Sequence, residues 1–455
     1  MNDTIAAIAT GHQPTAIGIV RLSGPQAIAA LDQVFTPAGG KPMGEQPDRL
    51  LVYGTLHTPQ GAELDHCLAT VSRAPHSYTG EDTAELQCHG SPVLLSMALE
   101  ALFGCGVRQA RAGEFTQRAF LAGKMDLTRT EAVADLIHAE SQAAVYQAAG
   151  QLGGALAQVI EDIYQQLTYL MAHFHAVLDY PDEDIDPFEA REIAHTLAQA
   201  GDKLDKLSAT YRRGKALVEG IPCAIVGKPN AGKSTLFNAL LGYDRAIVTP
   251  IAGTTRDTVE ERLNLGGVLL RLIDTAWLRD SDDQVEQLGV ERSRQALRRS
   301  ELTLVVVDAS RPRDAEEEEL LSLAAAQGPT ILVYNKEDLP AAAPLPQPPA
   351  GVETVALSAL TGDGLDQLEL AISRLFPQDP GLRPGTLLTN ARQAQAAGQA
   401  RACLTRAQQA LQAGMPPDAV LTDVEEALTY LGELTGRVVR EDITSQIFQR
   451  FCVGK

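Results

Sequence analysis

The chain has 455 residues, a net charge of −20 and ordinary fractions of hydrophobic (45%) and charged (21%) residues, and its length predicts about three globular domains. No apolar run approaches the ~20 residues of a membrane span and no basic segment precedes an apolar one at the N-terminus, so we expect a cytoplasmic protein without membrane segment or signal peptide. Six dispersed cysteines without a CxxC pair argue against structural zinc or a disulfide framework. A chain with this negative net charge needs a local basic patch or a basic partner to bind nucleic acid.

The character of the sequence changes three times along the chain. Residues 1–118 contain short apolar runs separated by Gly, Pro and Asp, which predicts a strand-rich α+β domain. Apolar residues at helical spacing over 119–216 and again over 380–455 predict an all-α domain in two pieces. Between them, over 217–379, apolar strands alternate with helical patterns, which indicates a mostly parallel sheet covered by helices. We therefore expect a multidomain α/β plus all-α protein whose α/β domain is inserted into the helical one.

The most specific motif follows the apolar run Ile221–Val226 and reads Gly227-x-x-x-x-Gly232-Lys233-Ser234. A strand, a glycine loop and a helical pattern, in this order, are the context of a P-loop. The glycines let backbone N–H groups close around phosphate oxygens, and the dipole of the helix adds to the attraction. Lys233 would contact the β- and γ-phosphates, and the Ser234 hydroxyl would bind Mg²⁺. The alternative is a plain glycine turn, which this spacing disfavours.

Two later motifs favour guanine over adenine. The segment NKED at 335–338 follows an apolar strand, and the carboxylate of Asp338 can accept hydrogen bonds from the N1–H and N2–H₂ donors of guanine. Adenine lacks this pair of donors. The segment SAL at 358–360 follows the next strand and would supply a backbone contact to the guanine carbonyl oxygen. Each motif is weak alone, but their order and spacing predict a Ras-like domain that binds GTP.

Two stretches between these motifs are expected to surround the γ-phosphate. One threonine of the segment Thr254–Asp257 should bind Mg²⁺, and we choose Thr255; Asp274, at the end of the next strand, should support the Mg²⁺ without contacting it. The third residue after that aspartate is usually glycine, because its N–H meets the γ-phosphate in a conformation that a side chain resists. This chain has Trp277 instead. Either the loop tolerates the tryptophan or sensing of the γ-phosphate is lost.

The residue after the tryptophan is also unusual. Ras-like enzymes place a glutamine there to orient the attacking water, whereas this chain has Leu278, so another group must activate water. Any single acidic residue in the stretch that follows is, on sequence alone, better explained as solvated. The candidates in that stretch are Asp280, Asp282, Asp283 and Glu286.

Two cysteines stand in suggestive places. Cys452 lies four residues from the end, as in a prenylation box, but a glycine in the second aliphatic position and a terminal lysine argue against that modification. A buried structural thiol is the common alternative. Cys88 and His89 look like a metal-binding pair, although no further ligand stands at useful spacing in the sequence.

The motifs GKPNAGKS, GTTRD, DTAxLR and NKxD together resemble those of the MnmE (TrmE) family of tRNA modification GTPases. The segments IGIVRLSG, YTGEDTAELQCHG and RAGEFTQRAFLAGKMDLTRTEAVADLI and the final FCVGK also look like that family, so the resemblance extends over the whole chain. It implies a potassium-stimulated GTPase that acts with the FAD-dependent partner MnmG. The product would be a carboxymethylaminomethyl-type group on the wobble uridine of tRNA, with its carbon supplied by a tetrahydrofolate.

The resemblance also implies roles for individual residues. Glu286 matches the family's catalytic glutamate, and Cys452 matches a cysteine with a role in the modification chemistry. Asn230 matches the P-loop asparagine that binds K⁺, which would supply positive charge where other GTPases receive an arginine finger. The backbone groups that would complete the potassium site belong to Thr249, Ile251 and Thr254.

In the N-terminal region the family binds 5-formyl-tetrahydrofolate or a related tetrahydrofolate and forms a constitutive homodimer. Without the resemblance, the matching charged residues would be interpreted as surface charge. They are Arg21, Glu85, Lys124 and Lys455. The resemblance further implies G domains that meet face to face in the GTP state, a heterotetramer with MnmG, and tRNA as a partner.

All residues expected around GTP lie between 230 and 360. They are Asn230, Ala231, Gly232, Lys233, Ser234, Thr235, Thr249, Pro250, Ile251, Ala252, Gly253, Thr254, Thr255, Asp274, Thr275, Ala276, Trp277, Asn335, Lys336, Asp338, Ser358, Ala359 and Leu360. The rival interpretation is a ribosome-assembly or other RNA-binding regulatory GTPase, but no KH domain or second G domain is recognisable. A nucleotide-sensing scaffold is a third reading, to which Trp277 lends weight.

Overall fold

The computed structural model describes residues 3–11, 13–179, 190–243, 247–249, 261–273, 295–340, 348–377, 383–438, 447–448, 451 and 454. The chain divides into two compact units. The first unit comprises Met1–Ala134, Ile160–Ala190 and Gln409–Lys455, and the second comprises Asp135–Val159 and Arg191–Gln408.

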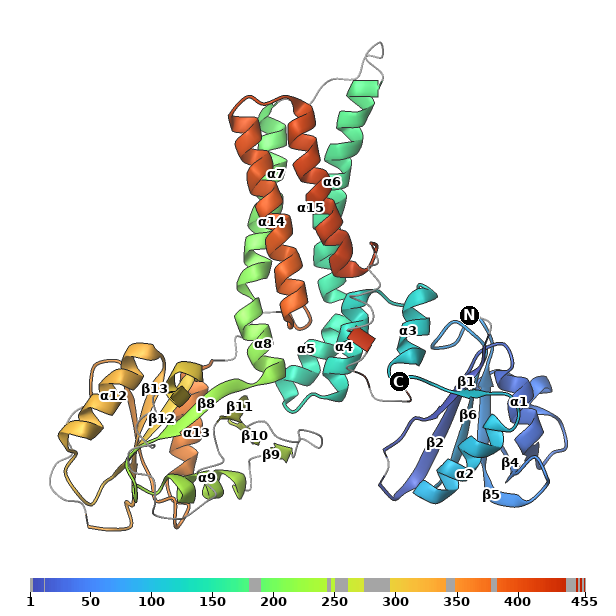
Figure 1. The fold of residues 1–455 in the computed structure, drawn as a ribbon, viewed down its shortest axis with the longest axis horizontal. Coiled ribbons are helices and arrows are strands. Elements are labelled where there is room, and N and C mark those ends of the chain that lie inside the picture. The colour runs from blue at the N-terminus through green and yellow to red at the C-terminus, as the bar shows by residue number, and fades with distance from the viewer. Residues whose placement is uncertain are drawn as a thin grey trace. The chain divides into compact units, whose positions relative to one another are not determined.

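The first unit contains a seven-stranded sheet in the order β3-β4-β5-β6-β2-β1-β7 (Figure 1). Neighbouring strands are antiparallel except β1 and β7, which are parallel. Buried residues alternate with less buried ones in β5 and β6, so one apolar face of the sheet packs with helices α1 and α2. The strands are β1 Ile5–Ile8, β2 Thr15–Ser23, β3 Phe35–Pro37, β4 Val52–His57, β5 Glu63–Ser72, β6 Thr83–Gly90 and β7 Arg108–Gln109, and the helices are α1 Ala27–Val34, the 3₁₀ turn η1 Met43–Glu45 and α2 Pro92–Phe103.

The C-terminal residues of the chain return to the N-terminal part of the same unit. Phe448 and Phe451 pack against Phe120 at the end of α3. Gly454 has a φ of 103°, and a Cβ there would lie 2.2 Å from the carbonyl oxygen of Ile8, so only glycine fits this close contact with β1. The helices lying wholly or largely in this unit are α3 Glu114–Leu121, α4 Leu127–Ile137, α6 Ala155–Asp179 and α15 Pro417–Thr435.

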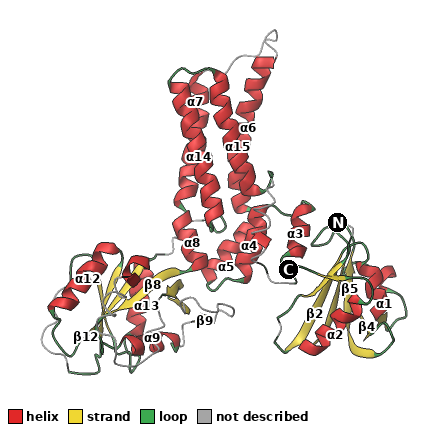
Figure 2. Cartoon of the chain, viewed as in Figure 1, coloured by secondary structure: helices red, strands yellow, loops and turns green. Residues whose placement is uncertain are grey.

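The second unit contains another seven-stranded sheet, in the order β14-β13-β12-β8-β11-β10-β9 (Figure 2). The five strands from β14 to β11 are parallel, whereas β10 is antiparallel to both of its neighbours. The strands are β8 Ile221–Val226, β9 Ile247–Thr249, β10 Glu261–Leu265, β11 Val268–Leu272, β12 Leu302–Asp308, β13 Thr330–Asn335 and β14 Glu353–Ala356.

Helices cover both faces of this sheet, because its central strands are apolar on both sides. All six residues from Leu302 to Val307 are buried, as expected for a parallel strand between two helical layers. One core contains Phe237 of α9 Lys233–Leu241 and Leu368 of α13 Leu365–Leu375, and the other contains Leu321 of α12 Ala315–Gln327. Together with the sheet of the first unit and the helices, this confirms the predicted fold class.

A helical part of the second unit holds the chain where it leaves the sheet domain. The helices are α5 Gln142–Leu152, α7 Ala190–Ala209, α8 Tyr211–Glu219 and α14 Ala391–Gln412. The side-chain amides of Gln147 and Gln151 both donate to the carbonyl oxygen of Leu387, at 3.2 and 2.7 Å. Gly150 allows the backbone of Pro384 to approach so closely that a Cβ would lie 2.4 Å from its oxygen. The segment that connects α13 with α14 is thereby fixed to α5.

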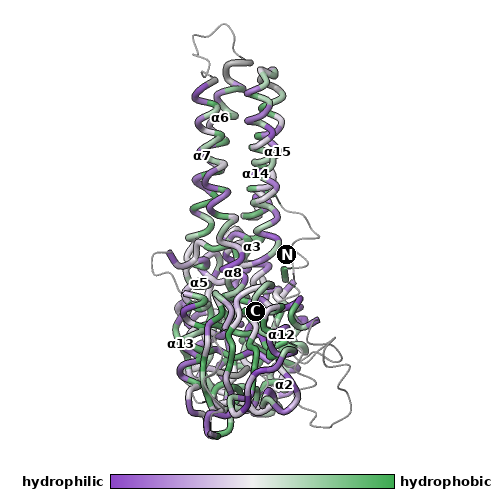
Figure 3. Tube along the Cα trace, turned by 90° about the vertical axis from the view of Figure 1, so that its left-hand side faces the viewer, coloured by the Kyte–Doolittle hydropathy of each residue, from purple (hydrophilic) through white to green (hydrophobic). Residues whose placement is uncertain are grey.

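No helix in the described ranges is long and apolar enough to cross a membrane. Hydrophilic and hydrophobic residues alternate along the long helices, as Figure 3 shows.

Candidate functional site

The glycine loop between β8 and α9 is held in a conformation that depends on its glycines. Gly227 and Gly232 have φ angles of 152° and 90°, a region that L-residues with side chains rarely adopt. A Cβ on Gly227 would lie 2.2 Å from the oxygen of Val306, and one on Gly232 would lie 2.1 Å from Nδ2 of Asn335. Asn230, exposed in the same loop, has a φ of 63°. The loop therefore wraps tightly over the ends of β12 and β13.

Lys233, the first residue of α9, is buried against this loop. Its Nζ donates a 2.7 Å hydrogen bond to the carbonyl oxygen of Lys228, and burial lowers its pKa to about 8. Ser234 and Thr235 follow it in the first helical turn and are exposed. A cation and a hydroxyl thus lie at the helix N-terminus, where backbone N–H groups and the helix dipole favour an anion.

Asn335 joins the segments 335–338 and 358–360, which are predicted to recognise the base, to the glycine loop. It ends β13; its Nδ2 donates to the carbonyl oxygen of Ala231 at 2.9 Å, and its Oδ1 accepts from the N–H of Ala359 at 2.9 Å. Asp338 accepts a 2.6 Å hydrogen bond from the buried hydroxyl of Ser358. Segments more than a hundred residues apart in the sequence are therefore linked through one buried amide.

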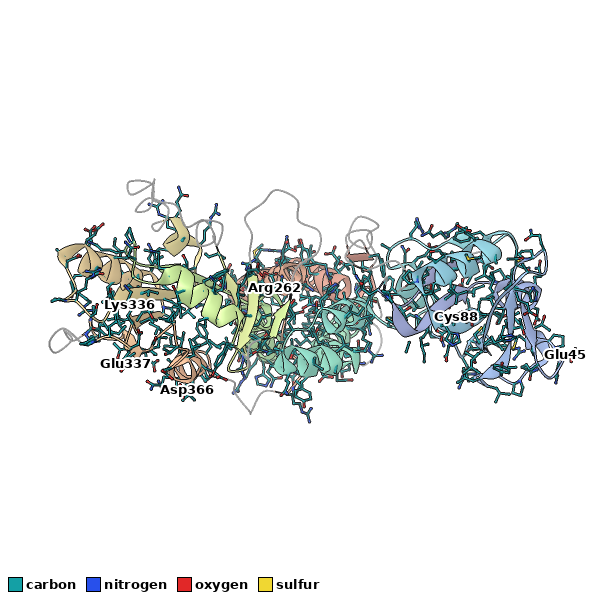
Figure 4. The ribbon with its side chains drawn as sticks, turned by 90° about the horizontal axis from the view of Figure 1, so that it is seen from below. Glu45, Cys88, Arg262, Lys336, Glu337 and Asp366 are labelled. Atoms are coloured by element: carbon teal, nitrogen blue, oxygen red, sulfur yellow. The ribbon has the colours of Figure 1, made fainter. Side chains whose placement is uncertain are left out.

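Lys336 makes an ion pair that the sequence does not reveal. Its Nζ lies 2.7 Å from Oδ2 of Asp308, the last residue of β12. Burial opposes ionisation of Asp308, but hydrogen bonds from Lys336 and Ser310 outweigh it and lower the pKa of this carboxyl to about 2. The only sequence feature that could have pointed to this ion pair is Asp308, the polar residue that ends an otherwise buried strand. The ion pair orients the segment that carries Asp338. Lys336 is labelled in Figure 4.

Another ion pair ties the glycine loop to helix α12. The Nζ of Lys228 lies 2.8 Å from Oδ2 of Asp314, and it also pairs with Glu316. Asp314 caps α12 together with Glu317, so its position is set by the helix itself. The cap was visible in the sequence as Asp-x-x-Glu, but its partner in the loop was not.

Several predicted site residues lie outside the described residues. For Thr249, in β9, the backbone is described and pairs with Arg262. The remaining ones are Pro250, Ile251, Ala252, Gly253, Thr254, Thr255, Asp274, Thr275, Ala276, Trp277, Glu286, Cys452 and Lys455.

A second group of predicted residues meets in the first unit. Arg21 of β2 faces Glu85 of β6 in the strand register, and its Nε lies 2.7 Å from the Glu85 carboxylate. The Arg21 guanidinium lies 5.9 Å from the ring centroids of both Tyr78 and Phe115. Lys124 reaches the same loop as Tyr78, because a Cβ on Gly80 would lie 3.2 Å from its Cε. The arrangement offers a planar cation, a carboxylate, an aromatic ring and an ammonium.

Buried charges that could not be predicted from the sequence support this loop. The guanidinium of Arg118, only 1% exposed, donates to the carboxylates of Asp3 and Glu81 at 2.9 Å and of Glu114 at 3.2 Å. Burial alone would raise the pKa of Glu114, but hydrogen bonds from Arg108 and Arg118 lower it to about 2. Because Glu81 lies in the Tyr78–Glu81 turn, this network fixes the turn beside Arg21.

The geometry of the second unit defines a P-loop nucleotide-binding domain with a guanine-type recognition segment. Comparison with known proteins places the chain more narrowly. Residues 4–124 match the family model described as GTP-binding protein TrmE N-terminus, and residues 127–452 match the model described as MnmE helical domain. The chain belongs to the MnmE family.

Full-length relatives agree with this assignment. A protein of Symbiobacterium thermophilum is 42% identical over 100% of this chain and 99% of its own length. Relatives from Roseiflexus sp. and Chloroflexus aurantiacus are each 43% identical over 100% of this chain, covering 99% and 100% of their own lengths. All three carry the name tRNA modification GTPase MnmE.

Proposed function

We propose that this protein is a GTPase that acts in the modification of the wobble uridine of tRNA. The observation that supports it best is the buried amide of Asn335, which links the glycine loop to the segment of Ser358, so that groups proposed to bind the phosphates and the base would act in one place. Family membership and the names of the relatives support the same activity.

The nucleotide would be held by groups with distinct tasks. Lys233 and the backbone N–H groups of residues 230–235 would bind the phosphates, and Ser234 with Thr255 would hold Mg²⁺. Magnesium would neutralise charge on the β- and γ-phosphate oxygens. Asp338 would accept from guanine N1–H and N2–H₂, and the hydrogen bond from Ser358 holds its carboxylate in place. The segments 249–255 and 274–277 would complete the site around the γ-phosphate.

Hydrolysis would rely on a cation and a carboxylate. Asn230 would bind K⁺ with backbone groups of Thr249, Ile251 and Thr254, and Glu286 would activate water, because Leu278 cannot. The exposed position of Asn230 in the loop supports the potassium assignment. Hydrolysis should be much faster in potassium than in sodium chloride, and Asn230→Ala should remove the difference. Equal rates in both salts for the parent protein would contradict the assignment.

The N-terminal region, residues 1–118, would bind a tetrahydrofolate and mediate homodimer formation. Arg21, Glu85 and Lys124, which the structure brings near one turn, would contact the folate together with Lys455. The G domain at 217–379 would be inserted into a helical domain formed by 119–216 and 380–455. Cys452 would take part in the modification chemistry, with the FAD-dependent MnmG as partner. Gly454 packs tightly on β1, which supports a contribution of the adjacent Lys455 to this site.

Nucleotide preference tests the proposal directly. Asp338→Asn should weaken GTP binding by roughly 10–100-fold, since charge-assisted hydrogen bonds contribute about 1.5–3 kcal/mol. It should favour xanthine nucleotide, which offers an acceptor to the new amide. The matched control is Glu337→Gln, which removes the exposed neighbouring carboxylate and should leave the preference unchanged. Equal GTP affinity for the parent and Asp338→Asn would show that guanine is not read here.

A further inference from the structure

Two buried cysteines face each other across neighbouring strands of the N-terminal sheet. Strands β5 and β6 are antiparallel with Leu68 opposite Gln87, so the same register places Cys67 opposite Cys88. Both belong to the apolar core on the helix-covered face, with exposed fractions of 5% and 2%. Figure 4 labels Cys88 in this sheet.

A carboxylate joins the two thiols. Asp65 precedes Cys67 by two residues in β5 and therefore points to the same face of the sheet. One ligand atom each from Asp65, Cys67 and Cys88 can be chosen so that all three lie within 4.8 Å of one another. The side chain of Asp65 is only 8% exposed.

His89 orients this carboxylate from outside the cluster. Its backbone N–H donates to Oδ2 of Asp65 at 2.9 Å, and its Nδ1 lies 2.8 Å from Oδ1. The imidazole is 75% exposed, so the cluster lies at the edge of the core rather than in its centre. Carboxylates that bind a metal are usually held in place by hydrogen bonds from groups outside the ligand set, and His89 makes two such contacts here.

We propose that Asp65, Cys67 and Cys88 form a binding site for one thiophilic divalent cation, with Zn²⁺ as the fitting ion. On binding, both thiols would lose their protons to solvent, so that two thiolates and one carboxylate would supply the sulfur and oxygen ligands that Zn²⁺ accepts, and a water would take the fourth position. The residues of this site belong to a different unit from the glycine loop, so it is a separate site from the proposed nucleotide site. It also answers the sequence-based objection that the pair Cys88-His89 has no further ligand, since β5 brings two.

The geometry requires only a small contraction. Bonds of about 2.3 Å to sulfur and about 2.0–2.2 Å to oxygen in a tetrahedron imply ligand atoms about 3.5–3.8 Å apart. The atoms here lie within 4.8 Å of one another, so side-chain rotations that close the cluster by about 1 Å would suffice. The alternative is a pair of thiols that only pack and hydrogen-bond to each other, as buried cysteines often do.

Metal titration of the reduced full-length protein, without nucleotide, tests the proposal. Cd²⁺ and Co²⁺ should each produce thiolate-to-metal charge-transfer absorption that saturates at one ion per chain, and Zn²⁺ should displace Co²⁺. Cys67→Ser and Cys88→Ser should each lose this absorption. The matched control is Cys105→Ser, since Cys105 packs against the same core but lies outside the cluster, and it should titrate like the parent.

A milder variant guards against loss of the fold. His89→Ala keeps all three ligands and should weaken Zn²⁺ binding by about 10-fold or more, the usual cost of losing such a support, with unchanged charge-transfer intensity. Absorption that persists in Cys67→Ser, or Zn²⁺ affinity equal to the parent in His89→Ala, would overturn the proposal. A reduced parent protein that binds no ion would also overturn it. So would a disulfide between Cys67 and Cys88 that forms equally fast with and without Zn²⁺.

Discussion

The two candidate sites of this chain are built in different ways. The nucleotide site depends mainly on backbone groups. A Cβ on Gly227 of its loop would lie 2.2 Å from the carbonyl oxygen of Val306, and the side-chain amide of Asn335 hydrogen-bonds to two backbone groups. The N-terminal site consists of side chains that meet across strands, with Arg21 paired to Glu85 and its guanidinium 5.9 Å from the centroids of two aromatic rings.

This difference explains which site the sequence reveals. A backbone loop needs a fixed number of residues, so its glycines keep a fixed spacing and can be recognised in a single sequence. Side chains on neighbouring strands meet through the register of the sheet, and the intervening loops can have any length. On this account the loop of the nucleotide site is sensitive to added volume at its glycines, whereas the N-terminal site is sensitive to the identity of its side chains.

The largest effect is expected where the nucleotide site depends on a side chain. Glu286→Ala should slow GTP hydrolysis by roughly 10²–10⁴-fold, the usual loss for a general base, with little change in GTP affinity. Single-turnover hydrolysis should be measured in a Trp277→Gly background, which we expect to be faster than the parent. Asp283→Ala serves as the control. A harmless Glu286→Ala in that background would mean that another group activates water.

Gly232→Ala tests the dependence on space. The new Cβ would lie 2.1 Å from Nδ2 of Asn335 and would occupy a φ of 90°. The left-handed conformation costs about 1–2 kcal/mol, and each lost hydrogen bond of Asn335 adds about 1 kcal/mol, so GTP affinity should fall roughly 100-fold. Gly242→Ala, after the same helix, has a φ of −92° and only an ordinary contact, so it should bind GTP normally. Equal affinities of the two variants would contradict this account.

The five parallel strands in the sheet of the second unit could be predicted almost residue by residue. The runs at 221–226 and 302–308 coincide with β8 and β12, because a parallel strand buried on both faces is apolar throughout. The antiparallel strand β10, Glu261–Leu265, was not predicted; its mixed pattern ERLNL satisfies neither a continuous apolar run nor a strict alternation. The helix-breaking segment Gly-Met-Pro-Pro at 414–417 lies where α14 ends and α15 begins.

The candidate sites were predictable to different depths. The glycine loop, Asn335 and Asp338 follow from spacing alone. The partners that fix them do not: Asp308, Asp314 and the buried Arg118 are charged residues whose role depends on which strands and helices lie next to them. A single sequence contains the charges but not the tertiary contacts that pair them.

The buried Lys233 predicts a pH dependence of stability. Its pKa of about 8 in the folded protein lies below the value of 10.5 for a free side chain, so between these two values the unfolded chain binds more protons. The free energy of unfolding should therefore rise from pH 8 to pH 10.5, by up to about 3 kcal/mol. Urea unfolding of the transition that GTP stabilises would measure this gain.

Two variants sharpen that test. Lys233→Met should lack the gain, whereas Lys228→Met should retain it, because ion pairing with Asp314 and Glu316 raises rather than lowers the pKa of Lys228. GTP should reduce the gain in the parent protein, since phosphate oxygens stabilise the charged ammonium. A gain of the same size in Lys233→Met would assign the pH dependence to another group.

The smallest effect is expected from a conservative exchange in the N-terminal site. Arg21→Lys keeps the positive charge and can still pair with Glu85, but an ammonium lacks the planar guanidinium that lies 5.9 Å from the centroids of Tyr78 and Phe115. Losing this planar contact should weaken tetrahydrofolate binding by about 10-fold, corresponding to about 1.4 kcal/mol. Calorimetric titration of the full-length protein would measure it.

Arg73→Lys, which alters an ion pair with Asp48 in the same sheet domain, is the matched control and should bind folate like the parent. GTP affinity should not change in either variant, because the glycine loop belongs to the other unit. If Arg21→Lys bound tetrahydrofolate as tightly as the parent, charge alone would suffice at this position, and the contrast between a site made of backbone and a site made of particular side chains would fail.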